Sequence, residues 1–285
     1  MSTTVTPPPP PAPAGGQTAH APQPRSTARV IAILAIVLGV VLILGAITTA
    51  VFSAIRSSAV RTDTLSADAA DIVALDIDVD AAGFRLEYDG TDEATLEVTG
   101  GQGSSAWSME RNGDSLRVKS DRPWWGGWGW WGDDERVVLT LPERYAEETL
   151  DASFDLGAGS ITADGTYGEL ELDLGAGSLD IGGSAANVDA DISAGRASLD
   201  FDDVDTARMH LSAGDIDGEL RGPVRALDLD VSAGRISLTV PDQAYDLSQD
   251  VSAGDLTHDL DTSSSARSTI TAQVSAGSIH LHAAR

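Results

Sequence analysis

The heptad DVSAGRI, residues 230–236, is the stretch that decides the fold, because close copies of it recur along the second half of the chain. The glycine that follows the alanine falls at positions 159, 177, 195, 214, 234, 254 and 277. A narrow period of about 20 residues is typical of one turn of a β-solenoid, in which each repeat stacks on the next. The repeat therefore predicts an all-β fold, a parallel β-helix or β-solenoid.

The alternation of side chains predicts where each turn bends. Apolar residues before Gly234 occupy odd positions, whereas those after it, from Ile236 on, occupy even positions. A strand alternates with period two, so this change requires a bend or bulge, and glycine tolerates the backbone angles of such a corner. We expect Ala233 to point into the corner. With a looser copy at 75–88, whose glycine is displaced by one residue, the array comprises about seven to eight coils.

The charge of the chain excludes several classes of function. Its net charge is −26, and all 44 acidic residues follow residue 62, together with 14 of the 18 basic ones. Such an acidic region repels nucleic acid, so we expect no nucleic-acid partner. The chain has no cysteine, which excludes disulfides, thiol catalysis and a lipid anchor on cysteine.

The N-terminal part of the chain predicts a membrane anchor rather than a folded domain. Residues 1–29 are rich in Pro, Ala and Thr and predict a disordered tail. Residues 30–55 contain no charged residue, and a helix of this length exceeds the thickness of the hydrocarbon core, so one transmembrane helix is expected. Residues 56–70 form a linker, and 71–285 form the solenoid domain. Basic residues flank the span equally, but the acidic domain favours a cytoplasmic N-terminus and an extracytoplasmic domain at the cell membrane.

One region resembles a known family. The segment VVLTLPERYAEETLDASFDLGAGSI (137–161), in which a strand ends in Leu-Pro before the first glycine-bounded repeat, is similar to the bacterial putative-adhesin β-strand-repeat family, and ISLTVPDQAYDLSQDVSAGDL (236–256) echoes it. The resemblance covers roughly residues 71–285. It implies a right-handed β-helix-like domain displayed outside the membrane, with adhesion suggested by the family name and no catalytic or binding residues to transfer.

A tryptophan-rich segment, PWWGGWGWWG (123–132), is the main candidate for a binding surface. It follows a hairpin predicted at Asn112–Gly113 and precedes a strand starting at Arg136, so we expect a long loop. Its aromatic rings suit stacking on sugar rings, contact with a protein, or insertion into the membrane interface; alternatively, the loop folds back and caps the solenoid. The candidate binding residues are Trp124, Trp125, Trp128, Trp130 and Trp131.

Acidic residues recur at one outward position of the repeat. This column contains Asp155, Asp173, Asp191, Asp230 and Asp250, with His210 and Gln273 as interruptions. Neighbouring carboxylates about 5 Å apart repel each other, and calcium could relieve the repulsion. The repeat is not the glycine-rich nonapeptide of calcium-binding β-rolls, so a solvated acidic face is expected, with no metal site and no cofactor.

Three further features are weaker candidates for chemistry. His280 and His282 emerge on one face as a two-ligand pair, and His258 is expected at an inward position of an irregular coil. The run DFDDVD (200–205) is the best cluster of paired acids, as in polysaccharide-cleaving β-helices, but no Lys or His accompanies it. No nucleophile or phosphate-binding motif is present, so we expect no enzyme.

These observations favour a membrane-anchored, extracytoplasmic adhesion or binding module of the cell envelope, without enzymatic activity, whose ligand is a cell-wall glycan or an envelope protein. The alternative is a regulatory or structural envelope protein that acts through a membrane protein partner. A polysaccharide-acting β-helix enzyme is the third hypothesis. A repeat scaffold alone determines neither the ligand nor the oligomeric state.

Overall fold

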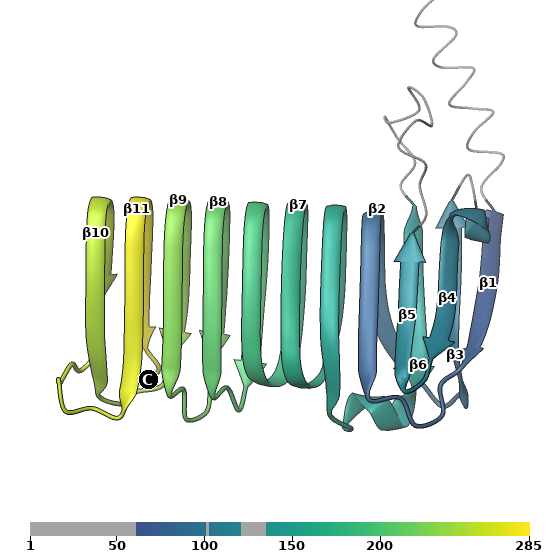
Figure 1. The fold of residues 1–285 in the computed structure, drawn as a ribbon, viewed down its shortest axis with the longest axis horizontal. Helices are drawn as coiled ribbons and strands as arrows, with labels where there is room; N and C mark the ends of the chain where they lie inside the picture. Colours follow the sequence, from purple (N-terminus) through teal and green to yellow (C-terminus); the bar gives the residue numbers. More distant parts are fainter. Residues whose placement is uncertain (1–60, 101–102, 121–134) are drawn as a thin grey trace, which may run out of the picture. The chain divides into compact units, whose positions relative to one another are not determined.

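The computed structural model describes residues 61–100, 103–120 and 135–285, which belong to one compact unit, Ser58–Arg285 (Figure 1). These residues form an all-β fold, as predicted, with only two short 3₁₀ helices among them, η1 (Gly103–Ala106) and η2 (Glu143–Ala146). No helix in this part of the chain is long and apolar enough to cross a membrane. The predicted tail (1–29) and span (30–55) lie outside the described residues.

Parallel rungs, each consisting of two arms that meet at a corner, form the body of the fold (Figure 1). Neighbouring rungs are in register, so that Gly195 pairs with Gly214, and Gly214 with Gly234. Among the described residues, eight rungs follow one another in space: β2 (Ala74–Asp89), three successive rungs within β7 (Leu150–Asp202), β8 (Thr206–Leu220), β9 (Ala226–Val240), β11 (Ser268–Ala283) and β10 (Tyr245–His258).

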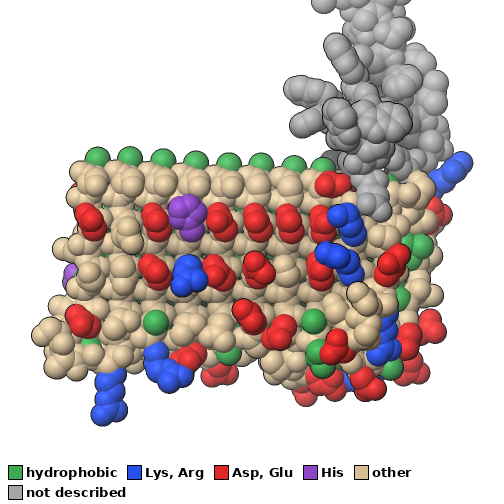
Figure 2. All heavy atoms as spheres, in the orientation of Figure 1, with side chains coloured by type: hydrophobic (Ala, Val, Ile, Leu, Met, Phe, Trp, Pro, Cys, Tyr) green, Lys and Arg blue, Asp and Glu red, His purple; other side chains and the backbone are tan. Residues whose placement is uncertain are grey.

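The corner lies where the sequence predicted it, but Ala233 points the other way. Val231 before the corner and Ile236 after it are both fully buried, as the change of parity requires, whereas Ala233 is exposed. The chain turns through residues 232–235, and the alanine lies on the outer side of this turn. The expectation of an inward alanine was therefore wrong, and Figure 2 shows small apolar side chains along an outer ridge of the stack.

The glycines of the corner have no room for a side chain. Each of the seven has a positive φ, between 115° and 153°. A Cβ built on any of them would lie 2.0–2.4 Å from a backbone oxygen of the adjacent rung. In β2, Ala82 is the residue opposite Gly159, and Gly83 is opposite Ser160, which confirms the looser copy with its glycine displaced by one position.

Antiparallel strands cover the end of the stack beside β2. A composite rung lies against β2, with β5 (Ser115–Ser120) on its first arm and β6 (Arg136–Pro142) on its second. β3 (Glu93–Gly100) pairs antiparallel with β6, and β4 (Trp107–Asn112) pairs with β5. Gly113, at φ 68°, turns β4 into β5, so the predicted hairpin is confirmed.

The ordered sheet begins earlier than expected. β1 (Arg61–Asp68) lies within the segment that was expected to be a linker, 56–70, and it pairs antiparallel with β3 along its whole length. Leu65 and Ala67 alternate with more exposed residues and pack against the hydrophobic core. This short alternation was too weak a signal in the sequence, and the correction extends the β domain to Arg61.

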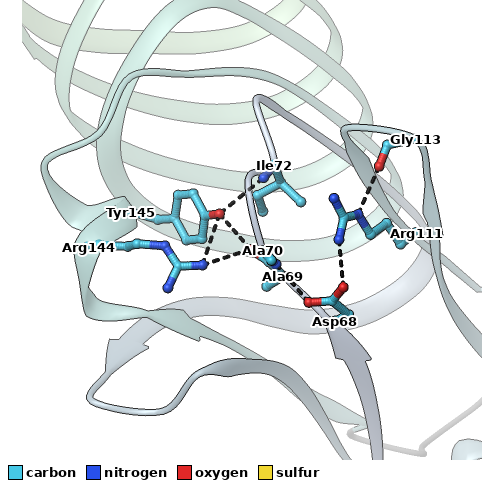
Figure 3. Close-up of polar contacts among 8 residues, drawn as sticks. All are labelled: Asp68, Ala69, Ala70, Ile72, Arg111, Gly113, Arg144 and Tyr145. Atoms are coloured by element: carbon cyan, nitrogen blue, oxygen red, sulfur yellow. Dashed lines mark hydrogen bonds and ion pairs between the residues drawn. The ribbon is translucent and has the colours of Figure 1, made fainter.

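A buried tyrosine fastens the connection between β1 and β2 (Figure 3). The Tyr145 hydroxyl, on η2, donates to the Ala69 carbonyl oxygen at 2.5 Å and accepts from the Ile72 amide at 3.1 Å. Arg144 donates to the same Ala69 oxygen at 2.9 Å, and its guanidinium lies 4.5 Å from the centre of the Tyr145 ring. These bonds satisfy backbone groups that would otherwise be buried without partners.

The same connection is held from its other side by an ion pair. Arg111, on β4, lies 2.7 Å from the Asp68 carboxylate, which also accepts a bond from the Ala70 amide at 2.9 Å (Figure 3). Both interactions lower the pKa of Asp68, with the backbone bond as the larger cause. The connection between β1 and β2 is thus bonded to both η2 and β4.

The last two rungs are not stacked in chain order. β11, the last strand of the chain, pairs with β9 on one side and with β10 on the other (Figure 1). β10 is therefore the terminal rung, although it precedes β11 in sequence. The connection from β9 to β10 passes over one rung position, and Gln243 fastens it with bonds to the Val224 oxygen at 3.0 Å and to Ser268 at 3.2 Å.

Side-chain polarity explains this order. Gln249 and His258 occupy inward positions of β10, since they pair with Ala272 and Leu281, which are fully buried. In the terminal rung both polar side chains are exposed, which agrees with the expectation of an irregular coil at His258. An inner position would bury them against apolar neighbours without partners. Apart from Ser268 at the start of the strand, which is bonded to Gln243, the inward residues of β11 on the two arms are apolar and nearly fully buried: Ile270, Ala272, Val274, Ile279 and Leu281.

Candidate functional site

The tryptophan-rich segment is inserted at a corner of the composite rung. β5 ends at Ser120 and β6 begins after Glu135, and these two strands pair with the two arms of β2. In β2 only a few residues connect the arms, whereas residues 121–134 lie between β5 and β6 in the sequence. Trp124, Trp125, Trp128, Trp130 and Trp131 all lie outside the described residues.

Both ends of the insertion are anchored in the scaffold. Ser120 is 2% exposed, and its hydroxyl accepts a bond from the Asp80 amide at 2.7 Å. Glu135 is 4% exposed, and its carbonyl oxygen accepts from the Gly83 amide at 2.9 Å. A rigid scaffold with a long insertion is the usual way in which a protein presents a binding loop.

The end of the stack nearest this insertion is covered by described strands. β3 and β4 pair with the two halves of the composite rung, and β1 extends the sheet beyond β3. Terminal rungs require such cover against pairing with other sheets. At this end of the stack the described strands provide that cover.

The column of acidic residues exists as the repeat predicts. Asp191 pairs in register with His210, His210 with Asp230, and Asp230 with Gln273. Figure 2 shows this row of acidic side chains, interrupted by one histidine and ended by a basic side chain. At that end Asp78 pairs in register with Asp155 and extends the column by one member that the sequence did not reveal. The Asp78 carboxylate lies 2.9 Å from the Lys119 ammonium group.

Partial burial and the like charges along the column raise the pKa of Asp155. Partial burial is the larger cause, followed by the neighbouring carboxylate of Asp173 and then that of Asp78. Because the charged form is disfavoured in the folded state, its contribution to stability decreases as pH rises above the usual value of 3.8. The column is thus a source of repulsion at neutral pH.

This repulsion leads to a prediction for Asp155→Asn. The variant is expected to be more stable than the parent chain at pH 7, by less than about 1 kcal/mol, as for other exposed charge pairs. The advantage disappears as pH falls below about 4, where the parent carboxyl is protonated in both states. Urea unfolding at pH 7 and at low pH measures the difference. An advantage that grows towards low pH would contradict the assignment.

Other outward columns alternate in sign. Arg208 lies 3.1 Å from Asp189 and 3.9 Å from Asp228, on the two neighbouring rungs. Asp215 is similarly placed between Arg196 and Arg235, at 3.9 and 3.7 Å. Among the described residues, no group of three or more His, Cys, Asp or Glu side chains is arranged to hold a metal ion.

A shallow hollow lies beside Arg208 on the same outer face. It has a volume of about 500 Å³, crosses the rungs of β7, β8, β9 and β11, and is lined mainly by polar residues such as Asn187, Thr206 and Thr271. Hydroxyl, amide and charged groups of this kind form hydrogen bonds with many polar ligands. The hollow is a second candidate surface, and the sequence did not indicate it.

The candidate catalytic acids are engaged in structural contacts. Asp202 forms an ion pair with Arg221 at 2.9 Å, across one rung. Asp205 forms a two-bond pair with Arg225, and this hydrogen bonding lowers the pKa of Asp205. Asp203 lies in the turn with φ 59°. The run DFDDVD therefore forms turn and rung contacts rather than a convergent pair of carboxylates.

One histidine of the pair is engaged in a local contact, and the other is exposed. His280 lies 2.6 Å from the Thr257 hydroxyl through its Nδ1 atom, and His282 is exposed two residues later. Both occupy positions flanking buried Leu281, as the alternation predicts.

Comparison with known proteins identifies the family. The family model described as "Toastrack DUF4097" matches residues 72–285. No curated protein matches the chain.

Solved bacterial structures that resemble the chain have low sequence identity to it. A putative cell adhesion protein from Clostridium sporogenes is 9% identical, with 79% of this chain and 100% of that chain covered and a TM-score of 0.42. A putative adhesin from Bacteroides fragilis is 14% identical, covering 78% and 97%, also at 0.42. A putative lipid binding protein from Parabacteroides distasonis is 17% identical, covering 78% and 96%, at 0.31. Because its family model spans the whole array of rungs, the chain belongs to the Toastrack DUF4097 family.

Proposed function

We propose that the chain is a membrane-anchored binding module of the bacterial cell envelope, without enzymatic activity. Residues 30–55 would span the membrane once, with residues 1–29 in the cytoplasm and the rungs outside the cell. An acidic outer surface and the absence of cysteine suit this location. The ligand is a cell-wall glycan or an envelope protein, and the contact surface comprises Trp124, Trp125, Trp128, Trp130 and Trp131.

The observation that supports this proposal most is the place of the insertion. A segment with five of the six tryptophans is inserted between Ser120 and Glu135, and both anchoring residues are buried and bonded to β2. Tryptophan side chains combine a large apolar area with a hydrogen-bond donor, which suits stacking on sugar rings and protein hot spots. The acidic run DFDDVD, in contrast, is engaged in contacts between rungs and in a turn.

The test is binding of the full chain, in detergent micelles, to isolated cell-wall polysaccharide. Replacement of all five tryptophans by alanine is expected to weaken binding at least about tenfold, the loss of roughly 1.4 kcal/mol of binding energy. Arg208→Ala, in the hollow on the outer face, is the matched control and is expected to bind like the parent. Far-UV circular dichroism checks that both variants remain folded.

Two outcomes would contradict this assignment. Binding that is lost in Arg208→Ala but kept in the tryptophan variant would move the site to the hollow. If neither the parent nor the variants bind polysaccharide, a glycan ligand is excluded, and the ligand is an envelope protein or the chain acts through a membrane protein partner. If the chain acts through a membrane protein partner, replacement of residues 30–55 by an unrelated span would reproduce the phenotype of cells that lack the chain. The tryptophan variant would behave like the parent in the same cells.

A further inference from the structure

The terminal rung β10 has a free edge. Its inner side pairs with β11, and no other named strand among the described residues pairs with its outer side. Val251 is 38% exposed, whereas Val274, its partner in register on β11, is 2% exposed. Leu247 and Leu256 are only partly buried. A long edge with exposed apolar side chains is a template for pairing with another strand.

Hydrogen bonds at the start of β10 show which residues face this edge. The Tyr245 amide donates to the Asp261 oxygen at 3.0 Å, and its carbonyl accepts from the Ser263 amide at 2.8 Å. The turn that follows β10 thus covers the edge at Tyr245 alone. Since backbone groups alternate between the two edges of a strand, the inward residues that follow also face outward along the edge. Gln249, Val251, Leu256 and His258 are these residues.

We propose that this edge binds the same edge of a second copy of the chain, in an antiparallel two-fold dimer. The axis passes through the corner, between Ala253 and Gly254. Val251 then lies opposite the partner subunit's Leu256, and Gln249 lies opposite the partner subunit's His258, each reciprocally. The backbone groups of these four residues face the edge, and two-fold symmetry makes each of the two pairings occur twice. The four pairs form about eight main-chain hydrogen bonds, two for each pair.

The distribution of charge selects this register. It places Asp250 opposite the partner subunit's Thr257 and Asp255 opposite the partner subunit's Ser252, so no two carboxylates within β10 (Tyr245–His258) face each other directly. A shift of two residues in either direction keeps apolar residues on the inner face. However, it would place Asp250 opposite the partner subunit's Asp255 or the partner subunit's Asp259. Like charges directly opposite each other destabilise a sheet, so the shifted registers are disfavoured.

The opposite end of the domain favours a closed dimer over a filament. A head-to-tail stack that continues the parallel array would require a second open parallel rung, but that end is covered by the antiparallel strands β1, β3 and β4. An isologous contact through one surface closes after two copies. The interaction surface is therefore β10 alone, and it is independent of the ligand proposed above.

Single cysteines test the arrangement, because the chain has none of its own. Across the axis the two copies of residue 253 would lie about 6 Å apart, within the range of a disulfide. The full chain with Ala253→Cys, in detergent micelles under mild oxidation, is expected to form a disulfide-linked dimer. The control is Ala213→Cys, an exposed alanine at the same corner position of an inner rung, which is expected to remain unlinked.

Sedimentation equilibrium gives a second readout. Val251→Lys places a charge on the edge and is expected to raise the dissociation constant of the dimer at least about tenfold. Val73→Lys changes a second exposed valine, 52% exposed and remote from β10 in the sequence, and should leave the dimer intact. A parent chain that stays monomeric would overturn the proposal. So would equal linking of the two cysteine variants, or a dimer that persists in Val251→Lys. If Val251→Lys fails to fold, the cysteine comparison decides.

Discussion

Gly195→Ala is expected to lower the free energy of unfolding by about 3 kcal/mol or more, a large effect for the addition of one methyl group. Gly195 has φ 137°, a conformation that L-residues rarely adopt. A Cβ built there would lie 2.3 Å from the Gly177 oxygen on the adjacent rung. The new methyl group cannot be accommodated unless the two rungs separate, and separation would break the parallel ladder in the middle of the stack.

Gly90→Ala is the control for this prediction. Gly90 lies just after β2 and has no atom within 4 Å of a built Cβ, so its replacement should change stability by less than about 0.5 kcal/mol. Urea unfolding followed by far-UV circular dichroism measures both variants. If Gly195→Ala were as mild as Gly90→Ala, the close contact between the corners would be disproved.

Val274→Asp is expected to destabilise the chain by about 4 kcal/mol or more, whereas Val251→Asp should cost less than about 1 kcal/mol. The two valines pair in register, yet Val274 is 2% exposed and Val251 is 38% exposed. A carboxylate at position 274 would be buried between β9 and β10 without a partner. At position 251 it would reach solvent at the edge of the terminal rung.

The comparison should be made at a dilution at which the chain is monomeric, so that only folding is measured. Stacking in chain order would make β10 the inner rung and β11 the terminal one. Val251→Asp would then lower the free energy of unfolding more than Val274→Asp does. That result would contradict the structure.

The sequence was sufficient to predict the rungs and their corners. The glycine period and the change of parity around Gly234 give the period of the array, the position of the corner and the buried faces, and the turn at Asn112–Gly113 marks the hairpin. The ion pairs between rungs could also have been anticipated, because Arg208 and Asp189 are one repeat period apart in the sequence. A stacked repeat brings such residues side by side.

Other features depend on information that the period does not contain. β10 and β11 fit the same register in either order, so the heptads alone cannot order them. The signals were the inward Gln249 and His258 and the long gap between Gly254 and Gly277, which leaves room for the chain to return. Likewise, the role of Tyr145 depends on contacts with Ala69 and Ile72, which lie far earlier in the chain and which no local pattern reports.

The order of the last rungs supports both the dimer surface and the account of the fold, and disulfide trapping tests it most directly. Asp230 and Gln273 are neighbours in register, whereas Asp250 lies two rungs from Asp230, about 10 Å away and beyond the reach of a disulfide. In the cysteine-free chain, the double variant Asp230→Cys/Gln273→Cys is expected to form an internal disulfide, and Asp230→Cys/Asp250→Cys is not. An internal disulfide in the second variant and none in the first would show that the rungs follow chain order, and would contradict the account.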